Sequence, residues 1–255
     1  MENLTIAQRN AVRFCCAGAW AAPVAALVFD ARNVVFANDA ALHRLGYSNA
    51  SSLIGRAIDG VLHADVLPAD TARREIVAGT HTPLLGMPTK LLSCAGAPRP
   101  EIADVFPIEI AGSTLTLFTL HAGEAETRHK PIPRPEEIGA IGPELGLAVL
   151  EAMALPILIQ DQDTILFANA AARAHLGATD RSQIEGHPIM SIVHADGLSA
   201  AIERVGFVFA THQRLRRVPV KLRALDGRIL HVEADAYPLR AGGQTAALLV
   251  GRVVR

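Results

Sequence analysis

The chain has 255 residues, of which half are hydrophobic and 19% are charged, and its formal net charge is −1. A chain of this length typically folds into about two domains, each large enough to bury its own core. A nearly neutral chain lacks the electrostatic attraction that draws basic proteins to nucleic acids and anionic membrane surfaces, so we expect neither as a partner.

The first 22 residues are expected to form a helix, because Thr5 and Gln8 have the spacing of a capping box. The most apolar stretch, residues 14–29, is shorter than the roughly 20 residues that cross a bilayer, and it contains Pro23. A secretory signal is the alternative for this stretch. It is disfavoured because the apolar run continues into a strand that has a counterpart later in the chain. We therefore expect no membrane span and a cytoplasmic location.

An internal repeat determines the organisation of the chain. Residues 30–65 match residues 161–196 at an offset of 131 without a gap, and 14 of the 36 positions are identical. The same offset continues downstream, where Pro88 matches Pro219. A register kept over about 90 residues indicates one domain that occurs twice.

The two copies are separated by a spacer. It contains Pro131, Pro133 and Pro135, which favour an extended and semi-rigid conformation. A helix with Pro143 in its first turn is expected to follow. The expected parts are an N-terminal helix at 1–22, a first domain at 23–121, the spacer at 122–142, a linker helix at 143–155 and a second domain at 156–255.

Each copy begins with two short apolar runs. Four residues typical of a hairpin turn separate them, at 30–33 in the first copy and at 161–164 in the second. Asn38 and Asn169 follow the second run, where a helix N-cap belongs. A strand hairpin followed by a short helix is therefore expected at the start of each copy.

A longer helix is expected next, with Asp65 and Asp196 as its N-caps in the two copies. It is expected over residues 66–78 and 197–205. Alternation of apolar and polar residues then predicts three strands, in the second copy at 217–224, 228–238 and 245–253. The order predicts an α+β fold in which each unit is a five-stranded antiparallel sheet with short helices on one face, preceded by a helix.

These motifs together resemble the PAS domain family. Both copies contain FAN at the end of the second strand and HAD before the long helix, and residues 226–254 are similar to the last three strands of that family. The resemblance implies a sensory input module of bacterial signal-transduction proteins such as sensor histidine kinases. Such a module binds a small apolar ligand or a partner and relays its state through flanking helices to an output domain outside this chain. It also implies a homodimer or a partner signalling protein.

Six residues are candidates for ligand contact under this resemblance. They are Phe36, Asn38, His63, Phe167, Asn169 and His194. The structural interpretation is favoured for the asparagines, as helix caps, and for the histidines, as part of a helix start. No catalytic motif is present, so an enzyme is not expected.

No cofactor is required by the sequence. Cys15, Cys16 and Cys94 fit neither a disulfide framework nor zinc spacing. Haem is disfavoured because residues 66–79 and 197–206 contain no histidine, and photoactive flavin because the early helical regions contain no cysteine. Two alternatives stay open: a ligand-free interaction or dimerisation module, and a redox or gas sensor with non-covalent flavin or haem.

Overall fold

The computed structural model describes residues 6–121, 142–241 and 243–254. It divides the chain into two compact units. One unit is Ala19–Ala152, and the other is Met153–Arg255 together with the chain up to Gly18. The predicted capping box at Thr5 and nearly all of the proline-rich spacer, residues 122–141, lie outside the described residues.

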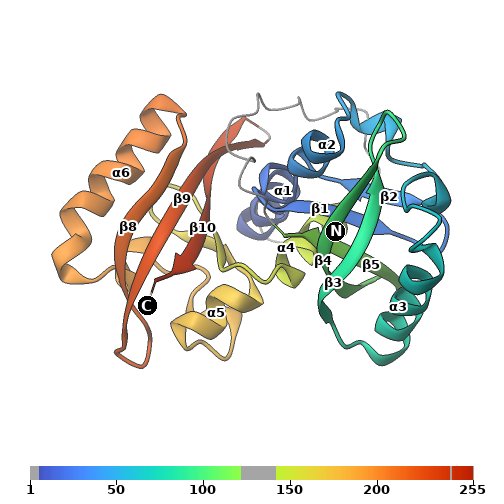
Figure 1. Ribbon diagram of the computed structural model, residues 1–255. Helices are drawn as coiled ribbons and strands as arrows, with labels where there is room; N and C mark the ends of the chain where they lie inside the picture. The colour runs from blue at the N-terminus through green and yellow to red at the C-terminus, as the bar shows by residue number, and fades with distance from the viewer. Residues whose placement is uncertain (1–5, 122–141, 242, 255) are drawn as a thin grey trace. The chain divides into compact units, whose positions relative to one another are not determined.

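The first repeat forms a five-stranded antiparallel sheet with the strand order β2-β1-β5-β4-β3. The helices of this unit lie in the segment of the chain that connects β2 to β3 (Figure 1). The elements are β1 (Ala25–Phe29), β2 (Val34–Ala37), α2 (Asp39–Leu45), η1 (Ala50–Ser52), η2 (Ile58–Gly60), α3 (Leu67–Thr80), β3 (Leu84–Leu92), β4 (Pro98–Ile110) and β5 (Ser113–Leu120).

The second repeat has the same topology, with the strand order β7-β6-β10-β9-β8. In Figure 1 its long helix, α6, runs beside β8 and β9. The elements are β6 (Ile157–Gln160), β7 (Ile165–Ala168), α5 (Ala170–Leu176), η3 (Arg181–Gln183), η4 (Ile189–Ile192), η5 (Ala195–Gly197), α6 (Leu198–Thr211), β8 (Leu215–Arg223), β9 (Ile229–Ala241) and β10 (Gln244–Val253).

The structure confirms the α+β class and the duplicated five-stranded unit. Strands β3 and β8 start 131 residues apart, as do β4 and β9. The hairpin turns are also equivalent, because the carboxylates of Asp30 and Asp161 each accept two backbone N–H groups of the following turn. The offset read from the sequence is thus the offset of the fold.

The asparagine caps are confirmed in both copies. The Oδ1 atom of Asn38 accepts the N–H of Ala41, and that of Asn169 accepts the N–H of Ala172. Each short helix ends at a glycine with positive φ, +79° at Gly46 and +72° at Gly177, a conformation that costs glycine little. The short helices therefore begin and end where the sequence placed them.

The predicted N-caps of the longer helices are wrong. Helix α3 starts after Val66 and α6 after Gly197, without a side-chain cap in either case. The carboxylates of Asp65 and Asp196 instead lie 2.6 and 3.3 Å from the Nζ atoms of lysines on the adjacent strand, Lys90 and Lys221. An extra turn separates each aspartate from its helix, which places the carboxylate beside the ammonium group. The hydrogen bond from Lys90 lowers the pKa of Asp65.

Two further helices precede the repeats. Helix α1 (Ile6–Ala21) lies before the first repeat and α4 (Pro143–Ala152) before the second. Although α4 is close in sequence to the second repeat, it belongs to the unit of the first, where it packs against β4. None of the helices in the described part of the chain is both long and apolar enough to cross a membrane.

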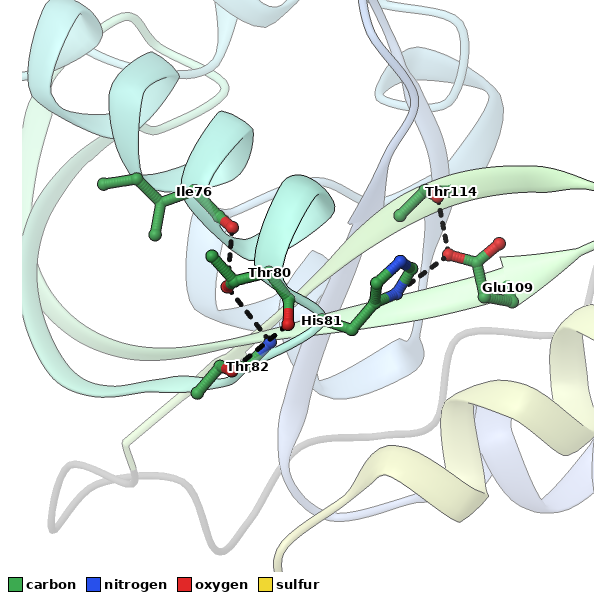
Figure 2. A network of polar contacts seen from close by, with 6 residues as sticks. All are labelled: Ile76, Thr80, His81, Thr82, Glu109 and Thr114. Carbon is green, nitrogen blue, oxygen red and sulfur yellow. Dashed lines mark hydrogen bonds and ion pairs between the residues drawn. The ribbon is translucent and has the colours of Figure 1, made fainter.

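A polar network joins the end of α3 to the last two strands of the first unit (Figure 2). His81 ends the helix with a φ of +52°, and its Nδ1 atom lies 3.4 Å from Oε1 of Glu109 on β4. Thr114 on β5 donates to the same carboxylate oxygen at 2.5 Å, and Thr80 donates to the carbonyl of Ile76 at 2.8 Å. His81 and Glu109 are exposed, so this network fixes a surface turn rather than a buried site.

Candidate ligand-binding cavity

The second unit contains a cavity of about 140 Å³ between its sheet and its helices, with exposed residues such as Val253 in its lining. Alternate residues of the strands form one wall because successive side chains of a strand point to opposite faces. On β9 the wall consists of Leu230, Val232, Ala234 and Ala236. Strand β8 adds Val218, Val220 and Leu222, β10 adds Ala247, Leu249, Gly251 and Val253, and β6 adds Leu158 and Gln160.

Helices form the opposite wall. Helix α6 contributes Ala201, Arg204, Val205 and Val208, α5 contributes Ala172, His175 and Leu176, and η4 contributes Ile189, Met190 and Ile192. Residues from two separate clusters of the unit's core occur in this lining, for example Leu176 from one and Val208 from the other. The cavity is therefore a gap between two parts of one hydrophobic core.

Only a few side chains in the lining are polar. Arg204 is partly exposed and donates through Nη1 to the carbonyl of Pro219 at 2.9 Å, and His175 is exposed. Gln160, in contrast, is 1% exposed, and its Oε1 atom has no hydrogen-bond partner among the described residues. The lining thus combines apolar walls with one fully buried amide.

Two aromatic rings occupy equivalent positions in the first unit. Phe29 occupies the position of Gln160 and Phe118 that of Leu249, at the same offset of 131 residues. Both rings are fully buried, and they meet edge to face with 5.1 Å between their centroids. Such a pair stabilises a core, and it places two rings at the positions where the second unit has an amide and a leucine.

Charged groups occupy a second part of the same space in the first unit. Asp70, at the position of Ala201, is 1% exposed and accepts hydrogen bonds from Arg73 at 2.8 Å and from Thr89 at 2.5 Å. Thr89 is the counterpart of Val220. The nearby Arg74 has a lowered pKa because burial desolvates it, although Asp70 acts in the opposite direction. The two units therefore share a fold and differ in the side chains at equivalent interior positions.

The candidates named from the sequence lie elsewhere. Phe36 pairs with Val28 and Phe167 with Ile159, and residues paired in this way share one face of a sheet. Ile159 alternates with Leu158 and Gln160, which line the cavity, so Phe167 faces the opposite side of the sheet. None of Phe167, Asn169 and His194 occurs among the described residues that line the cavity.

The side-chain amides of Asn38 and Asn169 form hydrogen bonds with backbone groups. Oδ1 of Asn169 accepts from Ile157 and Ala172, and Nδ2 donates to the carbonyls of Met153 and Leu155, at 2.8 to 3.0 Å. Asn38 makes the equivalent four bonds in the first unit. These amides tie the incoming chain and the first strand to the short helix.

The histidines of the two HAD motifs stabilise a turn. Nδ1 of His63 accepts the backbone N–H of Asp65 at 3.2 Å, and Nδ1 of His194 accepts that of Asp196 at 3.3 Å. Ligand contact by the six candidates stays a prediction. The sequence reasoning missed Gln160 and Leu249, and the signal was their replacement of phenylalanine at equivalent repeat positions.

The repeated hairpin–helix–strand unit defines an α+β domain that is present twice. The chain belongs to the PAS domain family: family models described as PAS domain match residues 21–77 and residues 154–252. PAS domains are typical sensory modules of signalling proteins. A search of the curated proteins found no match to the chain.

Several solved structures are similar to this chain. The PAS domain of an HTR-like protein from Haloarcula marismortui is 22% identical with a TM-score of 0.38, covering 42% of this chain and 88% of its own. The PAS domain of nitrogen regulation protein NR(II) from Vibrio parahaemolyticus is 22% identical with a TM-score of 0.35, covering 43% and 98%. An RNA-binding Light-Oxygen-Voltage receptor is 12% identical with a TM-score of 0.42, covering 91% and 95%.

Proposed function

We propose that the chain is a sensory input module in which the second PAS domain binds a small apolar molecule and the first provides a filled, rigid counterpart. The observation that carries this proposal is the apolar cavity of the second unit, whose equivalent space in the first unit holds Phe29 and Phe118. Concave, mostly apolar sites with few polar groups are the usual form of small-molecule sites.

The relay to neighbouring segments is part of the same proposal. Pro156, at the start of the second unit, and Val253, at the end of β10, both line the cavity. The N–H of Gly251 donates to the carbonyl of Pro156 at 2.9 Å, which joins the two ends of the unit at the cavity wall. A ligand that contacts these residues differently in two states shifts the equilibrium between those states. The receiver would be an output domain of a signalling protein such as a histidine kinase.

We propose that the module acts without catalysis of its own. Among the described residues that line the cavity there is no carboxylate, cysteine or hydroxyl side chain. The lining does contain one imidazole, that of His175, but it is exposed and has no carboxylate in the described lining to orient it, as a catalytic histidine usually has. Bound flavin or haem has less support, because the cavity has the size of a single ring and both cofactors are larger.

The test is to purify the full chain, denature it and identify released small molecules by mass spectrometry, alongside Leu249→Phe. This variant places in the second unit the ring that Phe118 supplies in the first. The proposal expects a small apolar compound from the natural chain and its loss from the variant. An equal yield of the compound from both proteins, or a flavin or haem absorption band in the natural chain, would contradict it.

A second candidate function is interaction with a partner protein or a second copy of the chain. Ile202 and Phe207 on α6 are 58% and 41% exposed, and contact with a partner would bury their apolar side chains. Sedimentation velocity on the natural chain and on Phe207→Ser tests self-association. A dimer weakened by the substitution supports this function, and a monomer in both cases removes the homodimer.

A further inference from the structure

The buried amide of Gln160 is a feature of the second unit that an apolar cavity does not explain. Its side chain lies at the end of β6, between Ile165 on β7 and Ala247 on β10 in the sheet register. The residue is 1% exposed, and its amide oxygen has no hydrogen-bond partner among the described residues. A buried acceptor without a partner costs free energy of folding, because it has given up its bonds to water.

A bound water is a poor partner for this oxygen. A buried water is held by two to four polar groups, and Gln160 is the one fully buried polar side chain among the described residues of the lining. The other polar lining residues are partly or fully exposed, and Arg204 already donates to the carbonyl of Pro219. The fitting partner is therefore a donor carried by the ligand itself.

The volume of the cavity and its apolar lining restrict the size and the charge of that ligand. A cavity of about 140 Å³ is close to the roughly 150 Å³ cavity that accepts benzene in another protein. An ionised group would lose its hydration in the apolar interior, so the group that reaches Gln160 is neutral. An amide oxygen accepts one or two N–H or O–H donors.

We propose that the cavity takes a neutral molecule of about one ring, or a short chain of equal size, with a single O–H or N–H group that donates to the side-chain oxygen of Gln160. The inference rests on the proposed function, since it names the chemical class of the ligand of the same cavity. Phe29 at the equivalent position makes such recognition specific to the second unit.

The experiment titrates the full chain with phenol and with toluene by calorimetry, in the natural protein and in Gln160→Leu. The two probes have nearly the same shape, and the comparison between proteins cancels their difference in hydration. The expected result is that the substitution shifts the ratio of phenol to toluene affinity toward toluene by about tenfold, the size of one hydrogen bond to a buried acceptor. Gln160→Met serves as a second variant if the leucine variant does not fold.

Two controls separate this inference from the proposed function. Leu249→Phe keeps Gln160 and fills the cavity, so it is expected to abolish binding of both probes. If both probes bind and the affinity ratio is unchanged by Gln160→Leu, the donor proposal is overturned while the ligand-binding function stands. If neither probe binds the natural chain, both are overturned. Benzoate binding more tightly than phenol would overturn the neutral donor in favour of an anion.

Discussion

The amide of Asn169 makes four hydrogen bonds in a space from which water is excluded. Two of its partners belong to the chain that enters β6, one to β6 itself and one to α5. Few side chains can donate twice and accept twice with this geometry. The residue therefore holds the start of the second unit together, and Asn38 does the same in the first.

Replacement of this amide is expected to destabilise one unit at a time. Asn169→Ala leaves two backbone carbonyls and two N–H groups without their partner, at a cost of about 2–4 kcal/mol to the second unit. Hydrogen exchange measured by mass spectrometry checks this, with Asn38→Ala as the matched variant in the first unit. Faster exchange spread equally over both units in either variant would contradict the assignment.

Replacement of Gln160, whose amide oxygen has no partner in the described part of the chain, is expected to raise the stability of the second unit rather than lower it. In the absence of ligand, Gln160→Leu removes a buried polar group without a partner and is expected to stabilise the second unit by about 1–2 kcal/mol. Urea unfolding followed by circular dichroism measures the change. A loss of stability would show that the amide is satisfied within the protein.

The asparagines could be predicted from the sequence, whereas the glutamine could not. Asn38 and Asn169 stand directly before helical segments, and capping is a local property of the chain. The surroundings of Gln160 depend on side chains from β10 and the helices, which are distant in sequence. Only the comparison of repeat positions, Phe29 with Gln160 and Phe118 with Leu249, indicates a cavity there.

At the scale of elements, both long helices end on a histidine in the left-handed conformation. His81 has a φ of +52° and His212 a φ of +55°. A side chain with a Cβ atom is strained in this region, which glycine enters freely. These helix ends therefore store strain that a substitution can release.

His212→Gly is expected to stabilise the second unit by about 0.5–1 kcal/mol, because glycine is the preferred residue at this cap position. Thermal unfolding of His212→Gly and of His212→Val measures the effect. The valine variant is expected to be less stable than the natural chain, since a β-branched residue tolerates positive φ poorly. Equal stability of the two variants would show that φ is not the cause.

The helix ends also show the limits of local prediction. The sequence placed the end of the second long helix at residue 205, but α6 continues to Thr211. Gly206 does not stop the helix, because packing of Val208 in the core holds the next turn. Similarly, the position of Asp65 and Asp196 between an apolar run and a helical segment predicts caps, but the lysine on the adjacent strand decides where their carboxylates lie.

At the scale of the whole molecule, the duplication has produced two units with one topology and different interiors. The fold could be predicted because strand alternation, turns and caps occur in the same order twice. The difference between the interiors could not be predicted as readily, since a cavity is a property of summed side-chain volumes. The first unit holds a pair of buried rings where the second has an apolar cavity.

The difference between the two interiors is expected to change the cost in stability when the side chain at one equivalent position is replaced by alanine in each unit. Phe29→Ala removes a fully buried ring and is expected to destabilise the first unit by about 3–5 kcal/mol. Gln160→Ala is expected to cost the second unit less than about 1 kcal/mol, because it removes little packing and one unpartnered group. Fluorescence of Trp20, in the first unit, and hydrogen exchange follow the two changes. Equal losses in both units would contradict the difference between the interiors.

The most direct measurement is the response of side-chain methyl groups to xenon, which enters apolar cavities and binds without any polar contact. In a methyl-labelled sample of the full chain, the resonances of Leu158, Val232 and Leu249 are expected to shift with xenon pressure, while those of Leu27 and Leu91 stay in place. Shifts of equal size in both units, or no shift in the second unit, would contradict a cavity confined to the second PAS domain.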